Sequence, residues 1–360
     1  MSQYNLEFFD LSLNHIHHDV IDEFSIDDDY LSPSETTVEI GKTDKLSIRN
    51  LVWIKGSIEF LGIITKVSTK DYVTEISFKP FISLFDQDVL IDTNVQNNGT
   101  ALEALIANKI REYWIESSDS LQNISTLTVS QATSTTSWGM NLKSDDEDKH
   151  HCIVGFYSVI IANAMSKYGI ALDASINFNN KTINIRIGKI TTAAYKIDAD
   201  LKNVQILTFS LKEPSSDINK LEVWNTDNYT QKRYYYLHPD GTYSTANNNR
   251  ITPVVLEVSS ATPSEDVDNP ADRITFAQAA NEVAISTFSG MEWTNLIELE
   301  MMVDDQLVKP LDLKYGQNVE IIHDGSVYTS ILTGKNLSRT VTLVFGTVRH
   351  DLTKILKSGG

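Results

Sequence analysis

Apolar and polar residues alternate along the first forty positions of the chain. Apolar side chains recur two positions apart in four short runs, Leu6 with Phe8, Leu11 with Leu13, Phe24 with Ile26, and Val38 with Ile40. A period of two places one face of a strand in a core and the other in water. We therefore expect half-buried strands here, joined by the acidic segment DDDYLSPS at 27–34 as a solvated loop. A calcium loop would need alternating oxygen ligands with a Gly and a final Glu, and that spacing is missing.

One pattern of this kind occurs twice, at residues 46–90 and 311–356. In each copy an L-x-[IL] triplet opens a strand, a Gly-Ser turn separates two apolar strands, and a third strand ends in a Phe of buried type, Phe78 or Phe345. The first copy predicts strands near 46–55, 58–68 and 72–81. The two registers match with one gap of two residues, which predicts two related β-domains side by side. The alternative is two unrelated β-meanders of similar length.

The middle of the chain has helical spacing. A capping box of Thr100 and Glu103 precedes one apolar face formed by Leu102, Leu105, Ile106, Ile110 and Tyr113. The acids 145–148 favour the N-terminus of a second helix over about 150–168, which Gly169 ends. A hairpin follows over 171–187, turning at Asn179-Asn180. This block predicts a compact α+β domain inserted after the first β-domain.

From Val204 the pattern returns to β. Residues 206–211 and 221–224 are expected to form neighbouring strands of the second β-domain. The segment RYYYLHPDGTYS predicts a hairpin at its Pro-Asp-Gly turn, and the acidic stretch 261–272 predicts an exposed loop. A second capping box, Thr275 with Gln278, opens a helix that stops at Gly290. Residues 296–303 begin the last barrel strands.

Charge limits the classes of partner. The 360 residues contain 48 Asp and Glu against 30 Lys and Arg, a formal net charge of −18. A groove that grips phosphates needs clustered Lys and Arg, so specific nucleic-acid binding is not expected. An acidic wall would instead repel DNA, which suits a passage through which DNA slides. The length allows roughly two to four domains.

Cysteine usage and targeting signals point to a protein made in a cytoplasm. The single cysteine, Cys152, rules out an internal disulfide framework, and its apolar surroundings favour a buried structural thiol over a nucleophile. The N-terminus shows no secretory signal. The longest apolar window, 152–165, is too short to cross a bilayer.

The search for chemistry finds no catalytic motif. A G-x-S-x-G elbow, a phosphate-cradling Gly-rich loop and H-E-x-x-H are all missing from the sequence. His15, His17 and His18 raise the possibility of a metal, but no further ligand spacing completes a site. The tyrosines at 234, 235, 236 and 243 have two interpretations, stacking on sugars or packing within their own domain, and packing is the more common. We therefore expect no enzymatic activity, no catalytic residue, no cofactor and no metal.

Three stretches carry a family resemblance: FSIDDDYLSPSETTVEI, LVWIKGSIEFLGIITKV and TEISFKPFISLFDQDVLID. They resemble the N-terminal domain of phage tail hub proteins, the siphophage baseplate hub or tail-associated lysin family, which is related to the central hub of contractile phage baseplates. NKLEVWN, YYYLHPDGTYS and GMEWTNLIELEMMVDD are similar to later parts of that family. The likeness covers most of the chain and lies in strand rhythm more than in invariant residues.

The resemblance implies a mainly β, α+β fold with two tube-type β-barrel domains related by internal duplication. It divides the chain into a first barrel over 1–94, an inserted α+β domain over 95–200, a second barrel over 201–225 and 291–360, and an inserted hairpin and helix over 226–290. Lysins of the family often carry a C-terminal lytic extension. This chain stops at the second barrel, so we do not carry that activity over.

The resemblance also implies a function. Three subunits would present six similar barrels and so join a sixfold tail tube to a threefold cap. The expected partners are a homotrimer, a hexameric distal tail protein, the tape-measure protein and receptor-binding proteins, with DNA passing through unbound. The expected location is the virion tail tip. Two alternatives remain open: a cell-wall-degrading or saccharide-binding tail protein that uses 226–290, and the hub of a contractile tail or injection machine.

Overall fold

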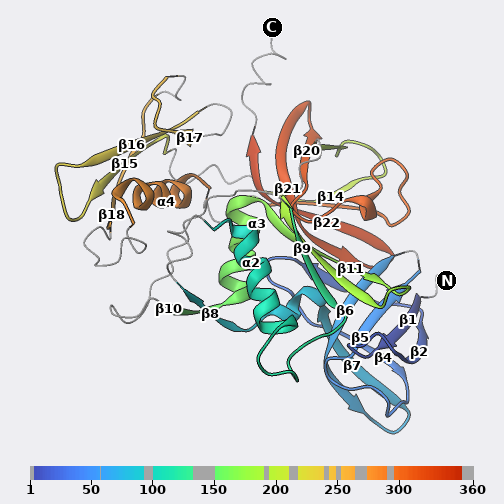
Figure 1. Cartoon of the computed structure of the whole chain (residues 1–360). Helices are drawn as coiled ribbons and strands as arrows, with labels where there is room; N and C mark the ends of the chain where they lie inside the picture. The colour runs from blue at the N-terminus through green and yellow to red at the C-terminus, as the bar shows by residue number, and fades with distance from the viewer. Residues whose placement is uncertain are drawn as a thin grey trace.

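The structure is a computed structural model. It describes the whole chain except residues 1–3, 57, 93–99, 133–150, 190–193, 211–217, 239–242, 249–252, 264–273, 290–295 and 351–360. Figure 1 shows two curled β-sheets on one side, a small helix-backed sheet on the other side, and an α+β unit in the centre. The mainly β, α+β fold class that the sequence predicted is confirmed.

The first sheet is built from the N-terminal eighty residues. Its strands are β1 (Tyr4–Phe9), β2 (His15–Ile21), β4 (Thr36–Gly41), β5 (Leu51–Lys55), β6 (Glu59–Thr69) and β7 (Val73–Pro80). They pair in the order β2-β1-β5-β6-β7-β4, and each of these pairings is antiparallel. The Gly41 backbone N–H donates to the Asp19 carboxylate at 2.7 Å, which ties β4 to β2 across the two edges. The sheet therefore curls almost into a barrel.

The second sheet gathers strands from distant parts of the chain. Its strands are β13 (Tyr195–Asp198), β14 (Gln205–Ser210), β19 (Leu296–Met302), β20 (Asn318–His323), β21 (Ser326–Leu337) and β22 (Thr340–His350). They pair in the order β13-β20-β21-β22-β19-β14. A seventh strand, β3 (Ile26–Asp29), comes from the N-terminal segment and pairs antiparallel with the second half of β21.

Four strands of each sheet follow the same topology. In the first sheet the strands β4 to β7 lie in the order β5-β6-β7-β4, and in the second β19 to β22 lie in the order β20-β21-β22-β19. In both, the first strand of the four crosses over to pair antiparallel with the last. Three strands of each four, β5 to β7 and β20 to β22, lie within the two repeated sequence segments.

The loops before β5 and β20 also match. Each loop exchanges two backbone hydrogen bonds with a long strand, β6 or β21. In the first unit Arg49 N–H donates to Ile64 O and Ile64 N–H donates to Asn50 O, both at 2.8 Å. In the second unit Gly316 N–H donates to Leu332 O at 2.9 Å and Leu332 N–H donates to Gln317 O at 3.2 Å. Arg49 and Gly316 both have a positive φ, of 70° and 76°. The likeness of the two units thus extends to an unusual backbone conformation.

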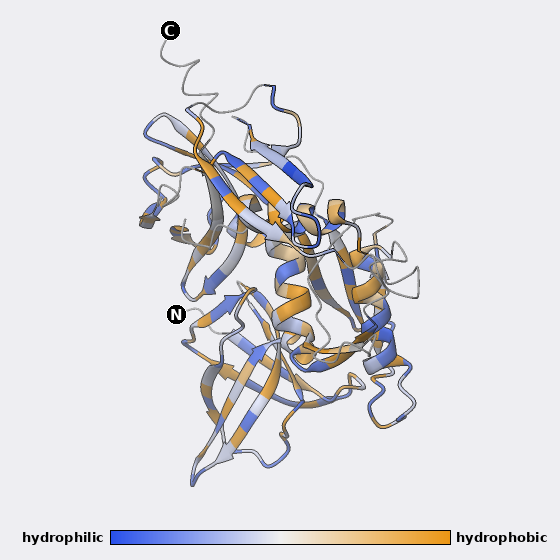
Figure 2. Ribbon diagram, turned by 90° about the vertical axis from the view of Figure 1, so that its left-hand side faces the viewer, coloured by the Kyte–Doolittle hydropathy of each residue, from blue (hydrophilic) through white to orange (hydrophobic). Residues whose placement is uncertain are grey.

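The two sheets share one hydrophobic core. Buried side chains of both belong to a single contiguous cluster, which includes Phe8 and Phe78 from the first sheet and Leu299 and Phe345 from the second. Figure 2 shows apolar and polar residues alternating along many of these strands. Such alternation is what buries one face of each strand in the shared core.

The α+β unit lies between the sheets and the helix-backed domain. It comprises the 3₁₀ turn η1 (Phe81–Phe85), β8 (Asp88–Asp92), α2 (Leu102–Ile110) with the π-turn η2 (Arg111–Ile115), β9 (Leu127–Gln131), β10 (His151–Gly155), the π-turn η3 (Phe156–Ile161) with α3 (Ala162–Tyr168), β11 (Ile170–Asn177) and β12 (Thr182–Lys189). β8 pairs with β10, and β11, β12 and β9 form a three-stranded sheet. The predicted hairpin at 171–187 and the helix stop at Gly169, which has φ 68°, are confirmed.

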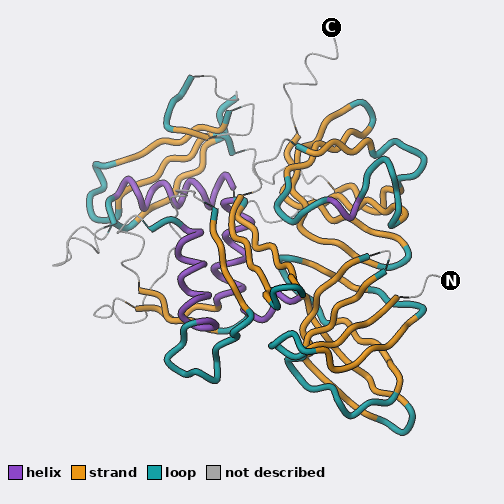
Figure 3. Tube along the Cα trace, turned by 45° about the vertical axis from the view of Figure 1, so that its right-hand side comes forward, coloured by secondary structure: helices purple, strands orange, loops and turns teal. Residues whose placement is uncertain are grey.

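The last unit is a four-stranded sheet with one helix on it, as Figure 3 shows. Its strands are β15 (Lys220–Asn225), β16 (Lys232–Leu237), β17 (Tyr243–Ser244) and β18 (Leu256–Ala261), and the helix is α4 (Phe276–Ser289). The predicted capping box at the start of α4 is confirmed. Gln278 N–H donates to Thr275 Oγ1 at 3.3 Å, and Thr275 N–H donates to Gln278 Oε1 at 2.8 Å. Leu221 and Val223 face the helix and are fully buried.

Two helix predictions need correction. Residues 151–155 form strand β10 and not the start of a helix, because they pair with β8 and alternate between buried Cys152 and the 74% exposed Ile153. Helical turns begin only at Phe156. The N-cap position of the first helix is Ala101, one residue after the expected Thr100, and Glu103 is buried. The acids at 145–148 lie outside the described residues.

Four strand placements also differ from expectation. β15 does not neighbour β14, because it forms the centre of the small sheet, between β16 and β18. β13 pairs with β20 and so belongs to the second sheet. The acidic link at 27–34 begins as strand β3 and not as a solvated loop. In the first hairpin, the second strand is β2, while Leu13 lies in the turn with φ 58°.

The matched loops predict a stabilising substitution. A residue with a side chain in the left-handed region costs about 1–2 kcal/mol, and part of the gain from glycine is lost to its greater freedom in the unfolded chain. Arg49→Gly should therefore raise the free energy of unfolding by about 0.5–1 kcal/mol in urea titrations. Gly316→Ala at the matching position should lower it. Equal or lower stability of Arg49→Gly would contradict the equivalence of the two loops.

Candidate functional site

Strand β3 leads directly into a buried tyrosine at the junction of three units. Tyr30 is fully buried, and its backbone N–H donates to the carbonyl of Thr333 in β21 at 3.0 Å. Its hydroxyl accepts a hydrogen bond from the backbone N–H of Leu172 in β11 at 2.9 Å. One residue thus connects the N-terminal segment, the second sheet and the α+β unit.

Two further tyrosines complete this cluster. The Tyr157 hydroxyl donates to the carbonyl of Tyr30, and the rings of Tyr30 and Tyr315 lie 5.5 Å apart between centroids. Burial raises the pKa of all three tyrosines above the usual value. They therefore remain neutral and act as hydrogen-bonding and packing groups.

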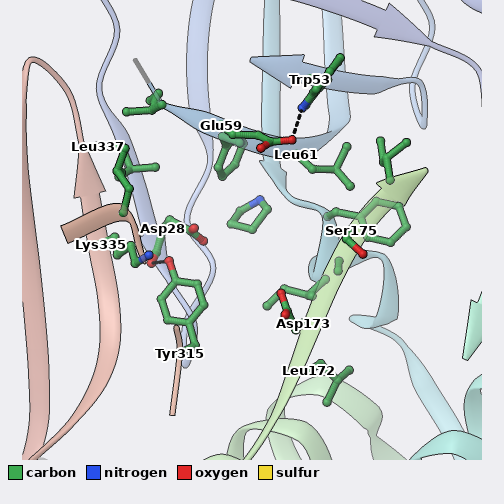
Figure 4. Close-up of a pocket in the computed structure, with 18 of the residues that line it drawn as sticks. Asp28, Trp53, Glu59, Leu61, Leu172, Asp173, Ser175, Tyr315, Lys335 and Leu337 are labelled. Carbon is green, nitrogen blue, oxygen red and sulfur yellow. Dashed lines mark hydrogen bonds between the residues drawn. The ribbon is translucent and has the colours of Figure 1, made fainter. Parts of the chain in front are cut away.

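A cavity of about 580 Å³ opens beside the tyrosine cluster, and Figure 4 shows the side chains around it. Its walls come from β5 and β6 of the first sheet, from η1, from β11, and from β3, β21 and the loop before β20. Trp53 Nε1 donates to Glu59 Oε1 at 3.1 Å on one wall. The cavity therefore lies where the two sheets and the α+β unit meet.

The opposite wall carries an acid and a base whose charged forms are disfavoured. Asp28 and Lys335 are cross-strand neighbours on β3 and β21. Burial raises the pKa of Asp28 from 3.8 to about 6 and lowers the pKa of Lys335 from 10.5 to about 8. The Tyr315 hydroxyl donates to the Asp28 backbone carbonyl at 2.9 Å, and Lys335 Nζ donates to the Leu313 carbonyl at 2.6 Å. None of these side chains belongs to a sequence motif that predicted a site.

The predicted histidines do not converge on one point. His15 Nε2 lies 2.8 Å from Glu7 Oε2 and His18 Nδ1 lies 3.1 Å from Glu7 Oε1, so both imidazoles bracket one carboxylate. His17 instead stacks on buried Phe8, with ring centroids 5.8 Å apart. The arrangement is that of a surface ion-pair cluster, which stabilises a strand pair by little.

A different group has atoms close enough to hold a metal ion. Asp200, His323 and Asp324 present ligand atoms within 4.8 Å of one another. Here His323 Nδ1 lies 2.6 Å from Asp200, and Nε2 lies 3.5 Å from Asp324. The hydrogen bond from His323 lowers the pKa of Asp200. Both imidazole nitrogens already face a carboxylate, so the contacts are those of an ion-paired turn.

The cysteine and the tyrosine group fit their packing interpretations. Cys152 is buried in β10, with Sγ 3.8 Å from the carbonyl of Ile91. Tyr243 stacks on Phe288 of α4, at 5.3 Å between ring centroids. On the other face of the sheet, Lys220 Nζ lies 4.8 Å from the Tyr234 ring and so covers it. These aromatic faces are occupied by the protein itself.

The raised pKa of Asp28 predicts a pH-dependent mutational effect. An acid whose pKa is higher in the folded state destabilises that state once it ionises, so its cost appears as pH rises from about 4 to about 6. The free energy of unfolding of Asp28→Asn, relative to the wild type, should therefore increase by about 1–2 kcal/mol between pH 4 and pH 7. Urea titrations at a series of pH values measure this difference. A difference that does not change with pH would show that Asp28 ionises as in water.

Comparisons with known proteins address the fold. No protein-family model matches the sequence, and no curated protein is found as a relative. Among solved structures, the tail protein from Neisseria meningitidis MC58 matches with a TM-score of 0.51 and 11% identity, over 95% of this chain and 96% of that one. The 43 kDa tail protein of prophage MuSo2 from Shewanella oneidensis has a TM-score of 0.48 and 11% identity, over 95% and 98% of the two chains. A chain of the phage P2 baseplate in its activated conformation has a TM-score of 0.46 and 12% identity, over 96% and 98%.

The first of these matches carries the conclusion. It spans nearly the full length of both chains, so the similarity includes the two sheets and the units between and beside them. In the described part of the chain, no helix is long and apolar enough to cross a membrane. The chain therefore shares its fold with this tail protein, which agrees at the level of the fold with the resemblance that its sequence motifs indicated.

Proposed function

We propose that the chain is a structural, non-enzymatic hub protein at the tip of a phage tail. The observation that carries this proposal is the repeated four-stranded topology within one chain whose overall fold is that of a tail protein. One fold can serve many functions, and the feature specific to this chain is the presence of two similar units in one subunit.

The two units are proposed to be related by internal duplication. The common order of four strands, the matching loop hydrogen bonds and the shared positive φ at Arg49 and Gly316 support this relation. The four-part division of the chain is kept as a proposal, with two strands reassigned. β13 is placed with the second β-unit, and β15 is placed with the small helix-backed unit, since their pairing partners lie there.

A duplicated unit solves a problem of symmetry. Three subunits with two similar units each present six similar surfaces, so a homotrimer can stack on a sixfold ring. The shared core of the two sheets would hold both surfaces of one subunit in a constant relation. The proposed partners are a hexameric distal tail protein on one side, the tape-measure protein within the channel, and receptor-binding proteins around it.

The charge supports a passage in preference to a binding groove. A net charge of −18 repels a polyanion, so DNA would move through the ring without adhering to it. The proposed place of action is the virion tail tip, after synthesis in the bacterial host. The hub of a contractile tail or injection machine would use the same symmetry.

The alternative of a saccharide-binding protein has less support. It needs several open aromatic faces on the small helix-backed unit. Lys232 Nζ lies 3.5 Å from the centroid of the Trp224 ring and Lys220 covers Tyr234, whereas Tyr229 is exposed in the turn between β15 and β16. A sugar ring would first have to displace these cations.

The oligomeric state tests the proposal. Light scattering coupled to size-exclusion chromatography should give a mass three times the 40.4 kDa of the chain. Cryo-EM classes of the same sample should show a threefold ring with six similar lobes. A chain that stays monomeric both alone and mixed with its distal tail protein would overturn the proposal. Zymography on host cell walls is the control for the enzyme alternative, where a lytic band would favour that reading.

A further inference from the structure

The cavity at the junction has an apolar wall and an open mouth. Trp53, Leu61, Phe81, Leu172 and Ile176 line it, together with the ring of Tyr315 on the opposite side. Its volume of about 580 Å³ is in the range of pockets that enclose small organic ligands. An apolar wall of this extent favours an organic group over a hydrated inorganic ion.

The charges around the cavity are mostly negative. Four carboxylates line it, those of Asp28, Glu59, Asp173 and Asp312, against one cation, Lys335. Lys335 is occupied by its hydrogen bond to the Leu313 carbonyl at 2.6 Å, and its pKa is lowered to about 8. The cavity therefore carries a negative potential that favours a cationic guest.

The carboxylates lie at defined positions around the cavity. Figure 4 shows Glu59 beside Trp53, Asp28 beside Lys335 and Tyr315, and Asp173 on β11, each on a different side of the cavity. The Asp173 carboxylate is paired with Lys314 Nζ at 2.8 Å, and the Glu59 carboxylate accepts a hydrogen bond from Trp53. The Asp28 carboxylate has no cationic partner within 4.0 Å among the described residues. Within the described part of the chain, the group of ligand atoms close enough for a metal lies elsewhere, at Asp200, His323 and Asp324.

We propose that this cavity binds a linear organic cation, an ammonium or guanidinium group on an apolar stem, through an ion pair with the Asp28 carboxylate. The stem would lie against the apolar wall, and the cationic head would donate charge-assisted hydrogen bonds to the carboxylate. Because its walls come from both sheets and from β11, an occupied cavity would hold the three units together. The cation can come from a free diamine or from a lysine side chain of a partner segment.

Calorimetric titration of the full-length protein tests the site. The probes are 1,5-diaminopentane for the free diamine and Nα-acetyl-lysine amide for the side chain, with magnesium chloride as the inorganic control. We expect saturable binding of at least one organic probe and a higher melting temperature when it is bound, with no such effect of magnesium. Binding of the lysine derivative alone would identify a side chain as the source, and binding of the diamine alone would identify the free molecule.

Charge-neutral variants locate the binding. Asp28→Asn should weaken binding at least about tenfold, which corresponds to one strong ion pair. Glu59→Gln keeps an acceptor for Trp53 and should weaken it several-fold. Asp71→Asn is the matched control, because it makes the same change of charge in the exposed turn between β6 and β7. Thermal melts of each variant establish that it is folded before titration.

Two results would overturn the proposal. One is the failure of both organic probes to bind at concentrations up to about 10 mM. The other is binding that is unchanged in Asp28→Asn and Glu59→Gln alike. Neither result bears on the trimer, whose mass is measured separately.

Discussion

The pairing of one short strand with a distant partner holds the two halves of the molecule together. β3 leaves the N-terminal segment and pairs with the second half of β21, beyond the part of β21 that pairs with β20. Buried backbone N–H and C=O groups must be paired, and this edge of β21 finds its partners in residues more than three hundred positions away. Tyr30 continues the contact into the α+β unit.

This crossing brings charge into a place where charge is costly. Asp28 enters the junction as part of β3, next to Lys335, and both lose part of their hydration there. The hydrogen bonds made by Tyr315 and Lys335 go to backbone carbonyls of the same junction. An acid left in such a setting is a functional candidate more than a stabilising one, because desolvation opposes the gain from its neighbours.

The two β-units are alike in their centres and different at their edges. Four strands share an order, a crossover and a loop, whereas the next strand is antiparallel β1 in one sheet and parallel β13 in the other. In the first sheet the Asp19 carboxylate of β2 bonds to the Gly41 N–H of β4, so the two edge strands are in contact. In the second sheet β21 pairs with the additional strand β3. A ring of such subunits would match a sixfold partner only through the shared part. The four shared strands would therefore provide the six similar surfaces of a trimer. The edges that differ would form the contacts between subunits or between the two β-units of one subunit.

The sequence by itself indicated many of the strands, where many turns lie and which helix has a side-chain cap. Alternation predicted β1 and β4, Gly169 ended a helix, and Thr275 with Gln278 opened another. These features are local, since side-chain spacing and backbone torsions act within a few residues. The two repeated segments were also visible, because a period of apolar positions survives when identities are lost.

The tertiary structure alone decided which strand pairs with which. β15 joined β16 and β18 and not β14, residues 151–155 became a strand because β8 offered an edge, and acidic β3 found its place on β21. The cavity beside Asp28 follows from that last pairing. Alternation states which face of a strand is buried but not which edge is paired, because strand edges bond through backbone groups that every residue carries.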